Sequence, residues 1–593
     1  MKWVGLTETI KSLKQLKKNK RKDLEVIKIA FLRNYTVEKI IPYLEFLLLK
    51  EGFLPKFYFS DYDNIFQDIL NNKSDYYKFC PDLTVIALST SFISEKLTYS
   101  FVNTLELDLE SEIKHILSQT NDIISTLSKK KVGPVLIHNF ETPKFPALGI
   151  LDYQSKKFQV NCYRNLNLEL ADISEKYKDT YIVDIDFLQR LLGTEEVNDR
   201  RYWHIEKNPY SHKFLQHLAQ EYLKFSKALK GKIKKCLILD FDNTLFGGII
   251  GEDGINGIKI GDTYPGSAFT NFQKSILNLY NRGIILGICT KNNKEDVLEV
   301  LNNHKDMILR SKHFSIIKAN WNDKATNIKN ISEELNIGLD SLVFIDDSPF
   351  EINLVQSQLP QVQAIQLPKD PSSYSDFIEE IGVFDSLSYS AEDKNRTKMY
   401  KADVKRKRIK TNFSNLDDYL TSLKMRIEIN KNDLLLVPRI SQLCQRTNQF
   451  NLTTKRYTEE EINSCIKDKN TDVFSISLKD KFGDMGVIGV SIIKYEKKNA
   501  VIDTFLISCR SLGRGVENAF LYCCLDEIKK RGCKIVTSYY YKTKKNNQVE
   551  NFYNTRGFKL IDKKRNNEKK FEFDRSKCLL IKLPKYFNIS INK

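Results

Sequence analysis

Long hydrophobic runs are missing from this chain of 593 residues. No window approaches the ~18 consecutive apolar residues that a membrane-spanning helix needs, so we do not expect an integral membrane protein. The first 22 residues are rich in lysine and contain no apolar segment followed by small residues, which excludes a secretory signal. We therefore expect a cytoplasmic protein.

Paired cysteines are also missing. The chain has 11 cysteines, and none has the C-x-x-C spacing of a structural metal site. In a chain of this size, scattered cysteines are typical of buried or catalytic thiols in a reducing compartment. A disulfide framework is not expected.

Low complexity and a balanced charge are missing as well. Hydrophobic residues make up 41% and charged residues 28%, which excludes a mostly disordered chain. The net charge is +18, but its densest basic runs, residues 405–408 and 563–565, are short, so a nucleic-acid role is not favoured. An acidic protein partner or a polyanionic small molecule is at least as compatible with this charge.

The chain is predicted to be an α/β multidomain protein. Apolar strand patterns alternate with helical stretches in residues 1–230 and again in residues 231–390, which indicates helix-covered parallel sheets. A charged helical connector is expected over residues 391–425. Residues 426–593 carry several neighbouring strand patterns and one long helical pattern, which is typical of an antiparallel-rich α+β domain.

Two aspartates stand at the end of the apolar strand Cys236–Phe241. Asp240 and Asp242 belong to the run D-F-D-N-T, which leads into a turn at Gly247 and Gly248. Carboxylates at i and i+2 on the carboxyl edge of a parallel sheet allow one to attack phosphorus and the other to manage a proton. The crowded anions call for Mg²⁺ as a counter-charge.

Further polar residues follow in chain order. Thr290 ends the next apolar strand, where its hydroxyl can hold phosphate oxygens. Lys324 can neutralise a phosphate and the nucleophile, and Asp346 and Asp347 end a third apolar strand, where they can complete a metal site. D-x-D-x-T alone is as well explained by a turn or a helix cap, but four motifs in this order favour catalysis.

This arrangement resembles the haloacid dehalogenase (HAD) phosphatase superfamily. The stretch CLILDFDNTLFGGIIGEDGINGIKIG is similar to the signature of FkbH-like proteins of HAD subfamily IIIC, with Phe246 where the family has Trp. Further matches are T-K-N at residues 290–292, FIDDSPFE at 344–351, DRRYWHIEKNPYS at 199–211 and RTNQFNL at 446–452. The resemblance therefore covers most of the chain.

The resemblance implies roles for the motif residues. Asp240 would be the nucleophile that forms an aspartyl-phosphate, and Asp242 the general acid and base. Thr290, Lys291 and Lys324 would bind phosphate. The metal ligands would be Asp240, Asp242, Asp346 and Asp347. Between Asp242 and Thr290 there is too little chain for a large cap domain, so we expect an open site.

The last segment resembles a GNAT acyltransferase. The run R-x-x-G-x-G lies between a strand and a helix, where successive N–H groups can hold a pyrophosphate. This resemblance implies a site for coenzyme A or for the phosphopantetheine of a carrier protein. Its residues would be Arg510, Gly513, Arg514, Gly515 and Tyr553, with Tyr553 protonating a thiolate.

Cys509 directly precedes that motif. A thiol at a helix N-terminus beside Arg510 would have a lowered pKa and could accept an acyl group. A small buried residue that closes a strand explains it equally well, and both interpretations stay open.

The first segment resembles the SGNH-like domains attached to some FkbH-like proteins. An SGNH hydrolase needs a G-D-S nucleophile loop, but the loop after the first strand has Asn34 and no serine, and a late D-x-x-H is missing. We therefore predict no hydrolysis by this segment. Asn34, His138 and Asn139 could line a remnant pocket, and a structural role for His138 is preferred.

Together the resemblances imply a Mg²⁺-dependent phosphatase and acyltransferase. The implied donor is 1,3-bisphosphoglycerate or a similar phosphorylated glyceryl compound, and the implied acceptor is the thiol of an acyl carrier protein. The alternative is a HAD phosphatase fused to a CoA-dependent N-acyltransferase for a surface polysaccharide or a secondary metabolite. A degenerate, non-enzymatic scaffold is a third interpretation that the intact motifs disfavour.

Overall fold

The computed structural model describes residues 5–18, 24–387, 399–403, 405–406, 409, 413–543, 545–563, 568–574 and 583–592. Part of the predicted connector, including residues 391–398, and the side chain of Arg510 lie outside the described residues. The chain divides into two compact units, Met1–Ser226 and Lys227–Lys593. The divisions that we predicted inside the second unit stay predictions.

The first unit is built on a parallel sheet. Among the described residues its strand order is β2-β1-β3-β4-β5. The strands are β1 (Glu25–Arg33), β2 (Phe53–Phe59), β3 (Leu83–Ala87), β4 (Val135–His138) and β5 (Thr180–Val183). The inner strands β3 and β4 are buried at every residue, as expected for mostly apolar strands in a sheet covered on both faces.

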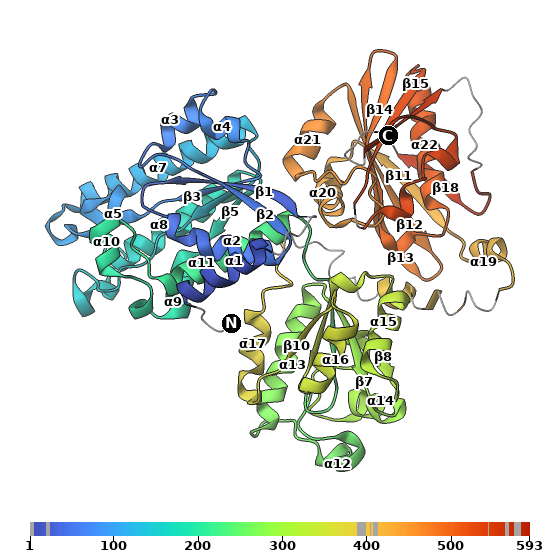
Figure 1. Ribbon diagram of the computed structural model, residues 1–593, viewed down its shortest axis with the longest axis horizontal. Coiled ribbons are helices and arrows are strands. Elements are labelled where there is room, and N and C mark those ends of the chain that lie inside the picture. Colours follow the sequence, from blue (N-terminus) through green and yellow to red (C-terminus); the bar gives the residue numbers. More distant parts are fainter. Residues whose placement is uncertain are drawn as a thin grey trace. The chain divides into compact units, whose positions relative to one another are not determined.

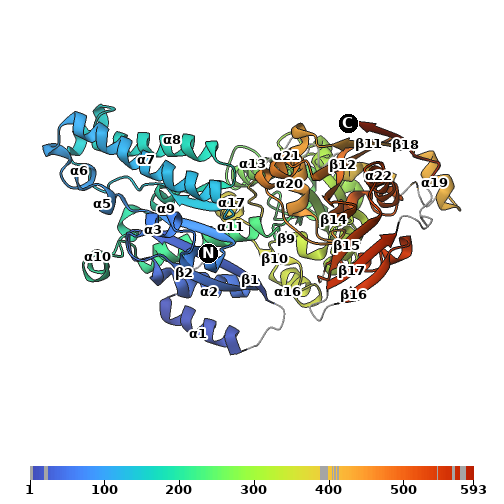
Figure 2. The same ribbon diagram turned by 90° about the horizontal axis from the view of Figure 1, so that it is seen from above.

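Helices cover both faces of this sheet. α7 (Glu106–Lys130) and α8 (Gln159–Lys176) pack together on one face, and α1 (Leu6–Lys18) and α2 (Ile41–Lys50) lie on the other (Figure 2). The predicted strand–helix alternation is thus present. Its carboxyl edge carries Asn34 and His138.

The second unit begins with another parallel sheet. Its order over the part of the chain that the structure describes is β10-β9-β6-β7-β8. The strands are β6 (Cys236–Leu239), β7 (Ile285–Thr290), β8 (Phe314–Ala319), β9 (Leu342–Asp346) and β10 (Gln363–Gln366). Sequence patterns predicted β6, β7 and β9 but not β8 and β10, which have partly exposed residues at the edges of the sheet.

Two groups of helices enclose this second sheet. α13 (Gly266–Asn281), α14 (Lys294–Asn303) and α17 (Tyr374–Glu380) share one apolar cluster with the sheet, and α13 and α17 lie side by side (Figure 1). α15 (Lys324–Leu335) and α16 (Pro349–Gln358) share another apolar cluster. Both faces of this sheet are therefore covered by apolar side chains, and the polar residues lie at the ends of the strands.

The rest of the second unit forms a large mixed sheet. Over the described residues its order is β16-β17-β15-β14-β13-β12-β11-β18, antiparallel except for the pairs β14–β15 and β11–β18. The strands are β11 (Arg426–Lys431), β12 (Thr471–Asp480), β13 (Gly483–Glu496), β14 (Asn499–Ile507), β15 (Ile535–Tyr541), β16 (Lys559–Lys563), β17 (Glu568–Asp574) and β18 (Asn588–Asn592).

The long helix of this part is α22 (Val516–Lys530), and α20 (Val437–Arg446) and α21 (Glu459–Lys467) pack elsewhere on the sheet. Two short 3₁₀ turns, Asn547–Val549 and Asn554–Arg556, lie between β15 and β16. Across the described residues, the helices include none that is long and apolar enough to cross a membrane.

Candidate active site

The carboxyl edge of the second unit's parallel sheet gathers buried charges. Asp240 directly follows β6, Asp346 ends β9, and Lys324 begins α15. The Lys324 Nζ lies 2.9 Å from Asp240 Oδ1 and 2.6 Å from Asp346 Oδ2. All three residues are buried. Residues that are far apart in sequence thus meet because parallel strands end at the same edge.

Three carboxylates at this edge could hold a metal ion. One ligand atom from each of Asp240, Asp346 and Asp347 lies within 4.8 Å of the others. Oxygen-only ligands of this kind suit Mg²⁺. The backbone N–H of Ser348 donates a 2.8 Å hydrogen bond to Asp346 Oδ1, which holds that carboxylate in place.

The electrostatics of the cluster follow from burial and crowding. Burial raises the pKa of Asp240 above its usual range, although Lys324 opposes the shift. Burial, reinforced by Asp346, also raises the pKa of Asp347. Burial disfavours the charged form of Lys324, but Asp240 and Asp346 outweigh it and raise the lysine's pKa. The site is therefore an anion cluster that needs positive charge.

Asp242 does not join the three carboxylates. Its Oδ1 accepts a 3.1 Å hydrogen bond from the N–H of Ile250, and its Oδ2 accepts a 2.8 Å hydrogen bond from Asn292 Nδ2. Asp242 is not one of the three residues of that group, and its role as a metal ligand stays a prediction. Burial raises the pKa of Asp242, which suits a proton donor.

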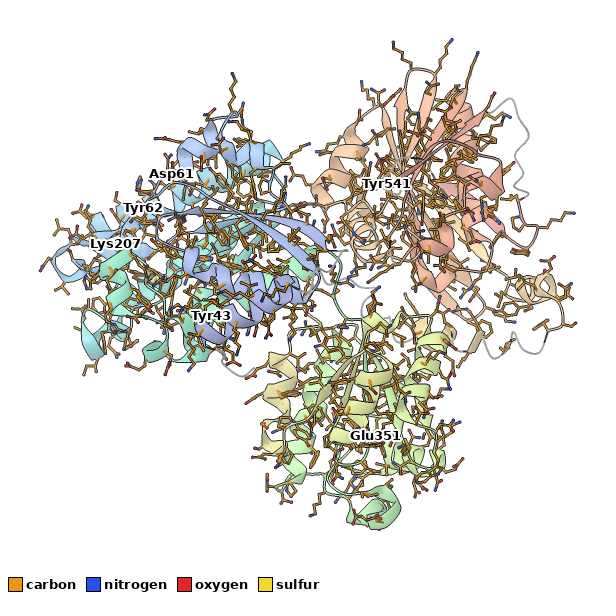
Figure 3. All side chains as sticks on the ribbon, in the orientation of Figure 1. Tyr43, Asp61, Tyr62, Lys207, Glu351 and Tyr541 are labelled. Carbon is orange, nitrogen blue, oxygen red and sulfur yellow. The ribbon has the colours of Figure 1, made fainter. Side chains whose placement is uncertain are left out.

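Thr290 and its neighbours form the next part of the edge. Thr290 is buried, and its Oγ1 accepts a 3.0 Å hydrogen bond from Asn292 Nδ2. Sequence reasoning did not select Asn292 as a site residue, although it stands two residues after the strand end. The Lys291 ammonium already contacts a carboxylate, because its Nζ lies 2.7 Å from Oε1 of Glu351 on α16. Glu351 is labelled in Figure 3. A bound phosphate would therefore share this lysine with Glu351. Glu351 ends the matched run FIDDSPFE but was not selected as a site residue.

Exposed apolar side chains lie close to this edge in sequence. Trp321 follows β8 and is 71% exposed, and Phe350, at the start of α16, is 67% exposed. The chain between Asp242 and Thr290 contributes α12 (Ile250–Gly257) and α13. These are single helices and not a cap domain.

The glycine-rich turn before α22 differs from the expected pyrophosphate site. Gly515 has a φ of +76° and caps α22, but a Cβ there would lie 2.7 Å from the hydroxyl of Tyr586. Arg514 is buried and its NH2 lies 2.8 Å from Asp403 Oδ1. A guanidinium held by a buried carboxylate is directed away from a ligand at the helix end, so the expected role of Arg514 is corrected. Gly513 also has a positive φ.

A segment of the chain itself occupies the opening between β14 and β15. These parallel strands pair only from Asn499–Ile502 to Ile535–Ser538. Beyond that point, Leu452 N–H donates to Phe505 O at 3.2 Å, and Tyr541 N–H donates to Leu452 O at 2.8 Å. Residues 450–452 therefore bridge the two strands; we call this segment the wedge. Tyr541 is labelled in Figure 3.

Tyr553 lies in the apolar core below the wedge. It is 1% exposed and contacts the rings of Phe552, Phe558 and Phe571. Burial raises the pKa of its hydroxyl strongly. A proton donor to a bound thiolate must reach that thiolate, so the expected role of Tyr553 is corrected.

Cys509 does not stand at the N-terminus of α22. It opens the short 3₁₀ turn Cys509–Ser511, and α22 begins at Val516. The residue is partly exposed, and its carbonyl accepts a 2.6 Å hydrogen bond from Asn336 Nδ2. The role of Cys509 as an acyl acceptor stays a prediction, and the side chain of Arg510 lies outside the described residues.

At the matching edge of the first unit, the residues expected to line a pocket are hydrogen-bonded to their neighbours. Asn34 Oδ1 accepts a 2.9 Å hydrogen bond from the N–H of Ser89, and Asn139 Nδ2 donates to Asp184 Oδ1 at 2.7 Å. His138 is fully buried between the hydroxyls of Tyr35 and Tyr222, at 3.3 Å and 2.6 Å. The three residues expected to line a remnant pocket are thus structural.

Comparisons with known proteins agree with this picture. Residues 50–225 match the model of the FkbH N-terminal domain, which confirms the FkbH resemblance over that stretch. No curated protein sequence matches the chain. The N-terminal part of protein BF1531 from Bacteroides fragilis, which contains a phosphatase domain and was crystallised with Mg, is 29% identical with a TM-score of 0.59. The match covers 65% of this chain and all of that one.

Acetyltransferase structures match a smaller share of the chain. The ribosomal-protein-S18-alanine N-acetyltransferase from Escherichia coli is 16% identical, with a TM-score of 0.20 over 25% of this chain and 90% of its own. An acetyltransferase from Thermus thermophilus is 14% identical, with a TM-score of 0.20 over 26% of this chain and 99% of its own.

Proposed function

We propose that the chain is a Mg²⁺-dependent phosphatase of the HAD type. It would act on a phosphorylated glyceryl donor such as 1,3-bisphosphoglycerate and pass the acyl group to the thiol of an acyl carrier protein. The observation that carries the phosphatase is the buried cluster at the end of β6, where Lys324 contacts both Asp240 and Asp346. The similarity to BF1531, which was crystallised with Mg, supports the metal.

Each residue of the cluster has a distinct task in phosphate removal. Asp240 attacks phosphorus, so that an O–P bond forms and the bond to the leaving oxygen breaks with its electron pair on that oxygen. Asp242 gives its proton to the leaving oxygen and then takes one from the water that hydrolyses the aspartyl-phosphate. Lys324 and Thr290 hold the phosphoryl oxygens.

A bound Mg²⁺, held by Asp240, Asp346 and Asp347, would supply positive charge for the phosphate oxygens. The donor set fits because each of these three residues offers a carboxylate oxygen within 4.8 Å of the others.

The carrier-protein substrate is supported by exposure and charge. No large cap covers the strand ends within the described residues, and Trp321 and Phe350 are exposed beside them. Aromatic side chains of this kind are enriched in protein interfaces. The net charge of +18 would favour an acidic carrier and a polyanionic donor. The acyl group would pass first to Cys509 or directly to the carrier's thiol.

The CoA-dependent N-acyltransferase alternative is disfavoured. A cofactor arm lying between two diverging parallel strands would use the backbone groups that Phe450 and Leu452 already occupy. The hydroxyl of Tyr586 also lies close over Gly515 at the start of α22. We therefore do not propose coenzyme A as a cofactor.

The first test replaces Asp240 with Asn. Amide oxygen is a poor nucleophile, so release of inorganic phosphate should fall at least about a thousandfold. Asp376→Asn, which removes an exposed carboxylate from α17, is the matched control and should leave the rate unchanged. The rate is measured as phosphate released from a phosphorylated glyceryl substrate in a Mg²⁺ titration.

A trapped intermediate separates this mechanism from direct attack by water. The wild-type chain should show an acid-stable, alkali-labile phosphoryl adduct on the peptide that contains Asp240. If Asp240→Asn retains more than about a tenth of the wild-type rate, Asp240 is not the covalent nucleophile.

A further inference from the structure

A cavity lies in the unit Lys227–Lys593, and none of the site aspartates lines it. Its volume is about 480 Å³, and Cys509 is part of its wall. Asn336, whose side chain hydrogen-bonds to the Cys509 carbonyl, also lines it. Cys509, which is partly exposed, therefore borders a space large enough for a small organic molecule.

The cavity is strongly cationic. Its lining includes six basic residues and a single carboxylate, that of Asp340. The basic residues are Lys234, Lys235, Arg282, Arg439, Arg446 and Lys545. Lys545 forms an ion pair with Asp340, so the one anion of the lining is already balanced. Burial lowers the pKa of Arg446 to about 10, which leaves it charged at neutral pH. Arg282 also forms an ion pair, with Asp385. The other basic side chains of the lining still favour an anionic ligand.

The cavity and the aspartate cluster lie at opposite ends of one sheet. Lys235 precedes β6, Ile285 begins β7 and Ser341 precedes β9, and all three line the cavity. The strands are parallel, so Asp240, Thr290 and Asp346 stand at their other ends. From Lys235 to Asp240 the chain advances about 16 Å, at about 3.3 Å per residue.

We propose that this cavity binds the phosphate-bearing acyl donor, with its phosphate among the cationic side chains and its acyl carbon at Cys509. The proposal rests on the proposed function and adds a second phosphate site to it. A three-carbon donor is about 10 Å long at about 1.5 Å per bond. It cannot reach Asp240 from the cavity, so acyl capture and ester hydrolysis are separate binding events.

The capture step balances with the donor alone. The Cys509 Sγ forms a bond to the acyl carbon of the acyl phosphate, and the C–O bond to phosphate breaks. The leaving phosphate takes the electron pair of that bond and the proton of the thiol. The phosphate ester at the far end of the acyl group stays among the basic residues, and it reaches the aspartate site only after the acyl group has passed from Cys509 to the carrier's thiol.

The test measures how fast Cys509 is alkylated. The full chain is treated with iodoacetamide, with 3-phosphoglycerate as the probe and glycerate, which lacks the phosphate, as its control. At about ten times its dissociation constant, bound probe should slow alkylation of Cys509 about tenfold. The exposed Cys80 serves as an internal reference and should react at one rate throughout.

A matched pair of lysines tests the basic lining. Lys545→Gln should weaken protection by 3-phosphoglycerate several-fold, because a charged contact to the phosphate is lost. Lys542 has nearly the same side-chain exposure, 42% against 44%, and does not line the cavity. In Lys542→Gln, 3-phosphoglycerate should therefore protect Cys509 from alkylation as well as it does in the wild type.

The outcomes are distinct. Equal protection by glycerate, protection by 4′-phosphopantetheine but not 3-phosphoglycerate, or no protection would each overturn the proposal. The phosphatase is judged separately, by phosphate release that depends on Asp240. In Asp240→Asn, acylation of Cys509 should continue, and intact-mass analysis should find an adduct that retains its phosphate ester. An adduct without phosphate in that variant would place ester hydrolysis elsewhere.

Discussion

The chain contains two parallel sheets of similar design, and their carboxyl edges differ sharply. In the first unit the edge residues satisfy one another: Asn34 bonds the backbone of Ser89, and His138 lies between two tyrosines. In the second unit Asp240 and Asp346 crowd around one ammonium group. At the edge in the first unit, neutral side chains hydrogen-bond to their neighbours. The edge in the second unit holds buried charges that a ligand can use.

The difference shows that a doubly wound sheet determines where a site can form, at the carboxyl ends of its strands, but not whether that site is reactive. Neutral amides and phenols at the strand ends build a stable structure that needs no ligand. Carboxylates at the same position are costly to bury and require a lysine, a metal ion or a phosphate complex to compensate. Whether an edge is reactive therefore depends on the residues that end its strands. Substitution of these residues tests the comparison between the two edges.

Among the changes that test this comparison, Lys324→Gln is expected to have the largest effect, because it should lower both stability and activity. Without the ammonium, Asp240 and Asp346 face each other uncompensated, and the free energy of unfolding should fall by about 3 kcal/mol or more. Phosphate release should fall at least about a hundredfold. Urea titration and phosphate assays measure both, with the exposed Lys329→Gln on the same helix as the control. An unchanged stability would show that the lysine does not balance the carboxylates.

A smaller effect is expected for Asp347→Asn. This change removes a ligand from the carboxylate group but leaves the contacts of Lys324 with Asp240 and Asp346 intact. The Mg²⁺ concentration for half-maximal activity should rise about tenfold or more, while the substrate requirement changes little. Isothermal titration with Mg²⁺ gives the same comparison without turnover. An unaltered Mg²⁺ titration would place the metal elsewhere.

The smallest effect is expected at the carboxyl edge of the first unit, where His138 lies. Burial lowers the pKa of His138 from 6.5 to about 3, so the folded chain keeps this ring neutral. As the pH falls below 6.5, the unfolded chain takes up the proton first, and stability should fall by about 1.4 kcal/mol per pH unit. His138→Gln should remove that slope in urea titrations at pH 7 and pH 5. Phosphate release should be unaffected, since a loss would give this edge a catalytic role.

Much of the phosphate site could be predicted because its residues follow apolar runs. Asp240, Thr290 and Asp346 each stand at the end of a strand that is evident from its hydrophobic residues. Parallel pairing then brings them to one edge, whatever the loops do. Asn292 and Glu351 could not be ranked in the same way, because their roles depend on contacts with Asp242 and Lys291 across the edge.

The C-terminal motif was harder to interpret from sequence. R-x-x-G-x-G has the right local geometry, since Gly513 and Gly515 have positive φ values. Residues from distant segments determine what this turn can bind. Asp403 forms an ion pair with Arg514, and the hydroxyl of Tyr586 lies close to Gly515. A local pattern describes the backbone of a turn but not the side chains that other parts of the chain bring to it.

The wedge at residues 450–452 also has a consequence for protein engineering. It joins strands that their own register leaves apart, through the carbonyl of Phe450 to Ile507 and through Leu452 to Phe505 and Tyr541. Redesign of the glycine-rich turn alone would therefore not create a cofactor groove. An engineer would first have to shorten the loop that carries the wedge and provide new partners for the backbone groups it satisfies.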